Sequence, residues 1–152
     1  MERIASFQVD HNKLVPGLYL SRRDGEVTTF DLRFKKPNTG DLLTNAEMHS
    51  IEHVIATLLR NGRAKDAIIY FGPMGCQTGF YLLFDSRRLG DEEAVELVKE
   101  TFAAGAAFEG PMPGKSPEEC GNYINLDVEL AREQCGFYSR LIRGWTAERL
   151  RY

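Results

Sequence analysis

The chain has 152 residues, of which 43% are hydrophobic and 27% are charged, and its formal net charge is −3. This balance is typical of a globular protein and excludes a disordered or fibrous chain. The length suffices for one domain with a sizeable core, so we expect residues 1–152 to form a single domain. A slightly negative chain has no electrostatic footprint for nucleic acid or for an anionic membrane, and we expect neither as a partner.

Three features of the chain bear on its compartment. Met1–Ser6 contains no apolar run of the kind that a signal peptide needs. The longest apolar run, near Ala67, has about six residues and is far too short to span a membrane. Three cysteines are an odd number, which argues against a disulfide framework and suits a reducing compartment. We therefore expect a cytoplasmic protein.

Two β-strands are predicted in the first quarter of the chain. Residues 17–22 and 26–34 are rich in strand formers, and Asp24–Gly25 between them is a hairpin signal. In the second strand, apolar residues at positions 30, 32 and 34 alternate with Asp31 and Arg33. Because successive side chains of a strand point to opposite faces, we expect Arg33 to emerge on the face opposite the buried one.

A helix is predicted next, from about Asn45 to Arg60. Thr44 and Glu47 have capping-box spacing at its start, and Asn61–Gly62 is suited to end it. Its apolar residues recur at the helical period and are expected to face the core. They are Met48, Ile51, Val54, Ile55, Leu58 and Leu59.

The second half of the chain adds two strands and two helices. Residues 67–71 and 80–84 are predicted strands, and residues 91–104 form a predicted helix. A Gly/Pro-rich loop at 110–117 leads to a last helix, for which Asp127 is the expected N-cap. The whole pattern predicts an α+β fold, in which an antiparallel β-sheet is packed against helices.

The most informative segment is His49–His53, an H-x-x-E-H run on the predicted helix. Positions i and i+4 of a helix project from one face, so the imidazoles of His49 and His53 can reach one metal ion. Glu52 points to the same side without having to bind the metal, which is the place for a general acid or base. The motif indicates a metal site but not a reaction. The alternative is a helix whose flank is merely polar.

A catalytic metal usually has three protein ligands and one open position, so the two histidines need a third partner. The remaining histidine, His11, lies in a segment that is predicted to be a loop. Cys135 falls in the apolar stripe of the last helix and is expected in the core. Cys76 lies among glycines and Cys120 lies in a loop. On residue pattern alone, either could be a ligand or an incidental thiol.

Several segments, taken in order, resemble the S-ribosylhomocysteine lyase (LuxS) family. They are Phe30–Phe34 with Pro37–Asn38, His49–His53, Pro73–Tyr81 and Cys120–Tyr123, and the opening Ser6–His11 also matches. The likeness runs from about residue 4 to residue 142 and includes all three histidines. One departure is Tyr70–Gly72, since the family commonly has Ile-Asp-Ile-Ser before the segment that begins at Pro73.

The resemblance implies a function and a set of site residues. Members of this family cleave the thioether of S-ribosyl-L-homocysteine to L-homocysteine, which is recycled, and 4,5-dihydroxy-2,3-pentanedione, the precursor of the quorum-sensing signal autoinducer-2. The implied residues are His49, His53 and Cys120 as metal ligands, Cys76 and Glu52 for proton transfer, and Ser6, His11 and Arg33 for substrate contact. The implied metal is Fe(II), one per chain, replaceable by zinc or cobalt. The implied assembly is a homodimer whose two active sites lie at the interface and are built from both chains.

Two other functions compete with this one. Metallopeptidases of the inverted-motif type also carry H-x-x-E-H, with the Glu as general base. We expect such enzymes to use a carboxylate as the third ligand, and they leave Cys76 unexplained. A non-catalytic domain that only holds zinc would need a closed site of four ligands. Its fourth ligand would have to be Cys76 or His11, for which the resemblance implies other roles.

Overall fold

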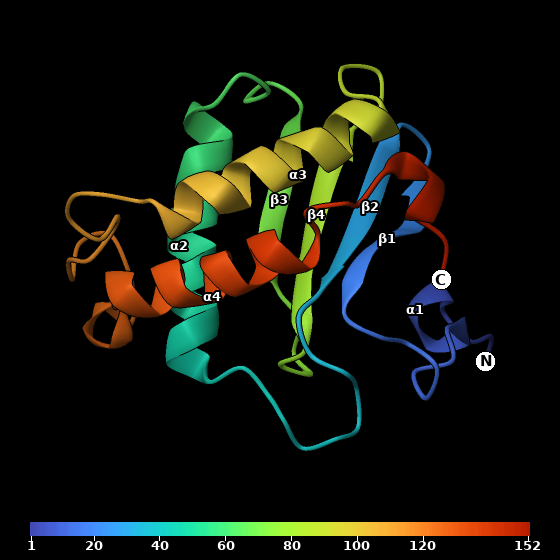
Figure 1. The fold of residues 1–152 in the computed structure, drawn as a ribbon, viewed down its shortest axis with the longest axis horizontal. Coiled ribbons are helices and arrows are strands. Elements are labelled where there is room, and N and C mark those ends of the chain that lie inside the picture. The colour runs from blue at the N-terminus through green and yellow to red at the C-terminus, as the bar shows by residue number, and fades with distance from the viewer.

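A four-stranded antiparallel sheet in the order β1-β2-β4-β3 runs through the protein (Figure 1). In the computed structural model, which describes residues 1–152, the strands are β1 (Gly17–Asp24), β2 (Val27–Arg33), β3 (Ile68–Pro73) and β4 (Gly79–Asp85). Each strand runs antiparallel to its neighbours in the sheet. The four strands and the antiparallel sheet predicted from the sequence are therefore confirmed.

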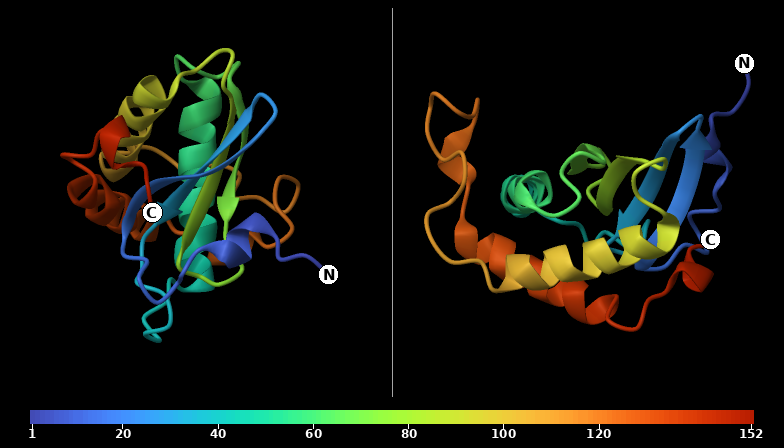
Figure 2. Two further views of the ribbon diagram at one scale, coloured as in Figure 1. Left: turned by 90° about the vertical axis from the view of Figure 1, so that its right-hand side faces the viewer. Right: turned by 90° about the horizontal axis from the view of Figure 1, so that it is seen from above.

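Three long helices pack against this sheet. They are α2 (Asn45–Asn61), α3 (Asp91–Ala106) and α4 (Val128–Leu141). α3 and α4 lie on the same side of the sheet, and α2 runs beside β3 (Figures 1 and 2). The predicted α+β fold is confirmed. No helix of the structure combines the length and the apolar character needed to cross a membrane.

The structure also contains short elements that the sequence pattern did not predict. They are the four-residue helix α1 (Ala5–Gln8) and the 3₁₀ turns η1 (Tyr123–Asn125) and η2 (Ala147–Arg149). A single turn is too short to display a helical period of apolar residues, so no sequence signal marks it. Both ends of the chain lie on the β1 side of the molecule (Figure 1).

The ends of α2 follow from local chemistry. The side chain of Thr44 accepts a hydrogen bond from the backbone N–H of Glu47, whose carboxylate accepts one from the N–H of Thr44. This is the capping box that the spacing predicts, and it satisfies amides that have no partner within the helix. The N–H of Gly62 donates to the carbonyl of Leu59 where the helix stops. The H-x-x-E-H run is thus held inside a well-capped helix of 17 residues.

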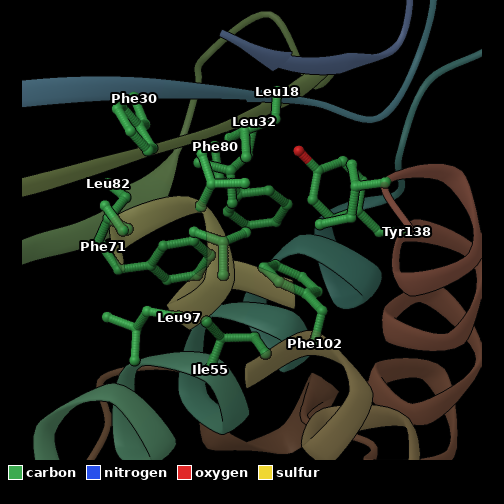
Figure 3. Close-up of a cluster of buried hydrophobic side chains, with 14 of the residues drawn as sticks. Leu18, Phe30, Leu32, Ile55, Phe71, Phe80, Leu82, Leu97, Phe102 and Tyr138 are labelled. Carbon is green, nitrogen blue, oxygen red and sulfur yellow. The ribbon is translucent and has the colours of Figure 1, made fainter. Parts of the chain in front are cut away.

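The core lies between the sheet and the helices (Figure 3). Phe34, which follows β2, stacks on Tyr138 of α4 with ring centroids 4.2 Å apart, and Phe71 of β3 stacks on Phe80 of β4 at 5.1 Å. Ile55 and Phe102 reach the same cluster from α2 and α3 (Figure 3). The stripe of α2 is buried except for Leu58, which is half-buried.

The opposite face of β2 is also buried. The sequence pattern predicts one buried face and, on the other side, a face from which Arg33 emerges. Asp31 and Arg33 point away from the core stripe, yet their exposed fractions are 1% and 2%. In the strand register Asp31 lies between Tyr19 of β1 and Tyr81 of β4. These aromatic neighbours shield the second face from water, so Arg33 is a buried cation rather than a surface one.

Candidate metal centre and active site

His49, His53 and Cys120 form a compact group of potential metal ligands. One ligand atom from each residue lies within 4.8 Å of the others, and all three residues are half-buried. The Sγ atom of Cys120 is 3.3 Å from Nε2 of His49. Two ligands placed about 2.1 and 2.3 Å from one ion at a tetrahedral angle lie about 3.6 Å apart. The three side chains therefore fit a single metal ion.

Both imidazoles are oriented through their second ring nitrogen. Nδ1 of His49 lies 2.7 Å from Oδ1 of Asn125, and Nδ1 of His53 lies 2.8 Å from the carbonyl oxygen of Pro113. Because both partners are oxygen acceptors, each Nδ1 carries the proton and donates. The two Nε2 atoms are then unprotonated and free to bind a metal, which is the usual arrangement in metal sites.

The segment that brings Cys120 to α2 is shaped by a close approach at Gly114. Its φ of +67° favours glycine, and a Cβ at this position would lie 2.8 Å from Nδ1 of His53. The N–H of Cys120 donates to the carbonyl of Ser116, which folds the loop into a turn. Loop and helix are therefore fitted to each other around the two imidazoles.

Glu52 lies on the same helix as the two histidines and is half-buried. It is three residues after His49, so the two side chains are neighbours on the helix surface. Ser50, on the buried side of the motif, accepts a hydrogen bond at 2.9 Å from the N–H of Asp127, just before α4. The motif thus has one face fixed to α4 and another that presents the metal ligands.

A second group of polar residues surrounds Cys76 in the loop between β3 and β4. The Sγ atom of Cys76 is 3.0 Å from Oγ1 of Thr78 and 3.8 Å from Nη1 of Arg33. Nη1 of Arg33 also donates to Oγ1 of Thr78 at 2.7 Å. Cys76 itself is exposed. The guanidinium of Arg33 thus lies beside an accessible sulfur, and a cysteine sulfur acts as base or nucleophile in its thiolate form.

The charge of Arg33 is secured by Asp31. Nε of Arg33 donates to Oδ1 of Asp31 at 3.1 Å, and Nη2 donates to Oδ2 at 2.6 Å. Burial acts to lower the pKa of Arg33, but the charge of Asp31 and these hydrogen bonds outweigh it and raise the pKa above its ordinary value. Arg33 is therefore a permanent, fixed cation beside Thr78 and Cys76.

Of the three predicted substrate-contacting residues, His11 and Ser6 line two different cavities and Arg33 lines neither. His11, Cys76 and Thr78 share a cavity of about 400 Å³ with residues of the loop 37–42. Ser6 lines another, of about 300 Å³, together with Tyr70 and other residues. Neither lining includes His49, Glu52, His53 or Cys120. Within one chain, the structure joins His11 to Cys76 in one cavity and gathers the metal ligands in a separate group.

Sequence reasoning missed residues that support these groups. Asp31 had a usable signal, because it precedes Arg33 by two positions and so shares its face of the strand. Asn125 and Pro113 had none, because their contacts depend on how a loop folds back on α2. Cys135 is buried in α4 as predicted, and burial raises the pKa of its thiol to about 12.

Comparison with known proteins places this geometry in context. The model of the S-ribosylhomocysteinase (LuxS) family matches residues 4–147. The chain belongs to the LuxS family. Among its relatives, the S-ribosylhomocysteine lyase of Desulfotalea psychrophila is 50% identical and covers 91% of this chain and 89% of the relative. The enzyme of the same name from Phocaeicola vulgatus is 45% identical and covers 100% and 98%. That of Finegoldia magna is 44% identical and covers 100% and 99%.

Membership of the LuxS family agrees with the resemblance and gives no support to a metallopeptidase. All eight residues that the sequence predicts for the site lie within the matched range of 4–147. The compact His/His/Cys group agrees with a metal-dependent LuxS protein. Tyr70, which belongs to the segment that departs from the common family pattern, lines the cavity of Ser6.

Proposed function

We propose that the protein is a metal-dependent carbon–sulfur lyase that cleaves S-ribosyl-L-homocysteine. The products are L-homocysteine and 4,5-dihydroxy-2,3-pentanedione, from which autoinducer-2 forms. The observation that carries this proposal is the group of His49, His53 and Cys120 in a chain of the LuxS family. The full-length relatives with the name S-ribosylhomocysteine lyase support it.

His49, His53 and Cys120 would hold the metal. Two imidazoles and one thiolate leave an open position on a four-coordinate ion, as catalytic sites require. When bound, the ion would polarise the carbonyl of the substrate and stabilise the negative charge that develops on its oxygen. We propose Fe(II), one per chain, with zinc or cobalt able to replace it. Iron, zinc and cobalt all accept this set of nitrogen and sulfur donors. The proposal of iron therefore rests on the family and not on the ligands.

Cys76 is the proposed base for the proton transfers on the sugar. The carbonyl of the ribose has to move along the chain before the sulfur can leave, and each move removes a proton from a carbon beside a carbonyl. Nη1 of Arg33 lies 3.8 Å from the sulfur and places a positive charge beside it. A thiolate at this position can take such a proton and return it to the neighbouring carbon.

Glu52 is the proposed second acid/base residue. It is half-buried on the same helix as two metal ligands, so its carboxylate can reach the hydroxyl groups of a substrate whose carbonyl is held there. Once the carbonyl lies next to the carbon that precedes the C–S bond, loss of a proton from that carbon expels homocysteine. A protonated side chain then supplies the proton that the leaving sulfur accepts.

Ser6, His11 and Arg33 are the proposed substrate contacts, and the proposed assembly is a homodimer with shared sites. In the single chain, the cavity of His11 and Cys76 has none of the metal ligands in its lining. A site that combines a base from one chain with a metal from its partner would resolve this separation. Several large apolar side chains that are exposed in the single chain are suited to an interface. They include Ile4, Phe7, Ile69 and Tyr70.

A thiol-release assay tests the proposed function. The purified protein is loaded with Fe(II) or Co(II) and given S-ribosyl-L-homocysteine in large excess, and free homocysteine is measured with a thiol-reactive dye. A sample without substrate corrects for the three cysteines of the chain. We expect thiol release that depends on both metal and substrate. A folded, metal-loaded protein that releases no thiol would remove the proposal.

A further inference from the structure

Tyr152, which lies outside the range that the LuxS model matches, reaches the buried ion pair behind Cys76. Its hydroxyl donates a hydrogen bond to Oδ2 of Asp31 at 2.8 Å. The same oxygen accepts the 2.6 Å hydrogen bond from Nη2 of Arg33. One carboxylate oxygen is therefore shared between the cation of the site and a tyrosine from a distant part of the sequence.

The segment that carries Tyr152 is firmly docked on β1. The N–H of Leu20 in β1 donates to the carbonyl of Leu150 at 2.7 Å, and the Leu150 side chain is buried. Trp145 lies so close to Gly17 that a Cβ there would be 2.5 Å from its ring. The ring of Tyr152 stacks on Tyr19, with centroids 5.0 Å apart and planes 21° from parallel. The contacts of this segment with β1 and the stacking on Tyr19 thus direct the hydroxyl of Tyr152 toward Asp31.

From Asp31 the interaction continues to the reacting thiol. Asp31 binds the Nε and Nη2 side of Arg33, while Nη1 on the other side donates to Thr78 and lies 3.8 Å from Cys76. The hydrogen bond from the hydroxyl of Tyr152 partly compensates the negative charge of Asp31. Asp31 then offsets less of the positive charge of Arg33, so the guanidinium exerts a stronger field on the sulfur of Cys76.

Toward Asp31 the hydroxyl of Tyr152 acts as a donor. Burial, together with the charge of Asp31 and the hydrogen bond to it, raises the pKa of Tyr152 well above its ordinary value. The hydroxyl therefore keeps its proton at any pH at which the enzyme works. Its nearest aromatic neighbour, Tyr19, donates to the carbonyl of Val15 at 3.0 Å and so does not compete for Asp31.

We propose that Tyr152 is a positioning residue for the lyase reaction. By sharing the carboxylate of Asp31, it orients Arg33 and directs its charge toward Thr78 and Cys76. The inference rests on the roles proposed above for Arg33 and Cys76, and it adds a residue from outside the matched family range.

The test compares two substitutions that each remove one tyrosine hydroxyl. Y152F keeps the ring stacked on Tyr19 but loses the hydrogen bond to Asp31. Y138F is the matched control, because the buried hydroxyl of Tyr138 donates to the carbonyl of Gly17 and forms no hydrogen bond with Asp31 or Arg33. The rate at which iodoacetamide modifies Cys76 at pH 7 is followed by mass spectrometry on the metal-loaded protein without substrate. The values of kcat and KM are measured separately with S-ribosyl-L-homocysteine.

We expect Y152F to slow the alkylation of Cys76 by about twofold to fivefold. The substitution removes the charge-assisted hydrogen bond to Asp31, which acts on the sulfur only through Arg33. kcat should fall by a similar factor with little change in KM, and Y138F should change neither. An alkylation rate equal to that of the wild type, or an equal slowing in Y138F, overturns the proposal. If no sample releases thiol from the substrate, the proposed function fails, but the alkylation rates still decide the role of Tyr152.

Discussion

Nδ1 of His49 donates a hydrogen bond of 2.7 Å to Oδ1 of Asn125, a residue 76 positions later in the chain. Asn125 is itself held, because its Nδ2 donates to Oδ1 of Asn45 at 2.7 Å, at the first turn of α2. The imidazole of His49 is therefore held by Asn125, which is in turn held by Asn45. Its Nε2 is directed to Cys120 by residues that do not bind the metal themselves.

Asn125→Ala should weaken metal binding by about tenfold to a hundredfold, the usual cost of losing such a supporting hydrogen bond. Asn125→Asp should keep or tighten binding, since a carboxylate oxygen accepts the same hydrogen bond. Competition with a metal chelator measures both affinities. Asn122→Ala is the control, because Asn122 is exposed in the same loop. An unchanged affinity in Asn125→Ala would mean that the loop alone orients His49.

Substitution of any one ligand by alanine, in His49, His53 or Cys120, should reduce the metal content well below one ion per chain. Each removes a third of the protein ligands, and no neighbouring position can replace the lost atom. Elemental analysis of the purified variants measures the effect. His11→Ala should retain its metal, because His11 lies in the other cavity. If Cys120→Ala kept full occupancy, the third ligand would have to be reassigned, with Cys76 as the first candidate.

Co-expression of two inactive variants tests whether the active site is shared between chains. In a mixed dimer of His49→Ala and Cys76→Ala chains, one site receives an intact metal group and an intact base, and the other receives neither. Random pairing makes half of the dimers mixed, so the lyase activity should recover to roughly a quarter of the wild-type value. A sedimentation experiment establishes that dimers form. Co-expressed variants that stay inactive although they form mixed dimers would place the whole site within one chain.

Cys76→Ala should keep the fold and the metal but lose thiol release, because no other side chain in the loop can take the proton. Cys76→Asp should retain only a trace of activity, since a carboxylate is a base of different reach and strength. In the wild type, Cys76 should also react with iodoacetamide far faster than Cys135, which is buried. Near wild-type turnover in Cys76→Ala would leave Glu52 to carry all the proton transfers.

How much of this site the sequence could predict depended on how local each signal was. The capping box of α2 and the pairing of His49 with His53 follow from helix geometry alone, and both were predictable. The choice of Cys120 over Cys76 as third ligand needed the family resemblance. Residues 49 and 120 meet only because a loop returns to α2. The burial of Arg33 was not predictable for a similar reason, since the aromatic residues that flank its partner Asp31 come from β1 and β4.

Stability at alkaline pH provides a last test, because burial raises the pKa of Cys135 from 9.0 to about 12. Below pH 9 the thiol is protonated in both the folded and the unfolded chain, so it adds no pH dependence. Between pH 9 and pH 12 only the unfolded chain releases the proton. The free energy of unfolding should then fall by up to about 1.4 kcal/mol per pH unit for this one group.

Urea unfolding at pH 8 and at pH 10.5 or so measures this loss. The tyrosines contribute in the same direction, since burial also raises the pKa of Tyr138 well above its ordinary value, so the thiol is isolated by substitution. Cys135→Ala should be less stable at pH 8, because it leaves a cavity beside Gly105. It should nevertheless lose less stability than the wild type between the two pH values. Cys76→Ala removes an exposed thiol instead and should keep the wild-type pH dependence. A Cys135→Ala chain with the wild-type pH dependence would show that the buried thiol ionises as readily as in the unfolded chain.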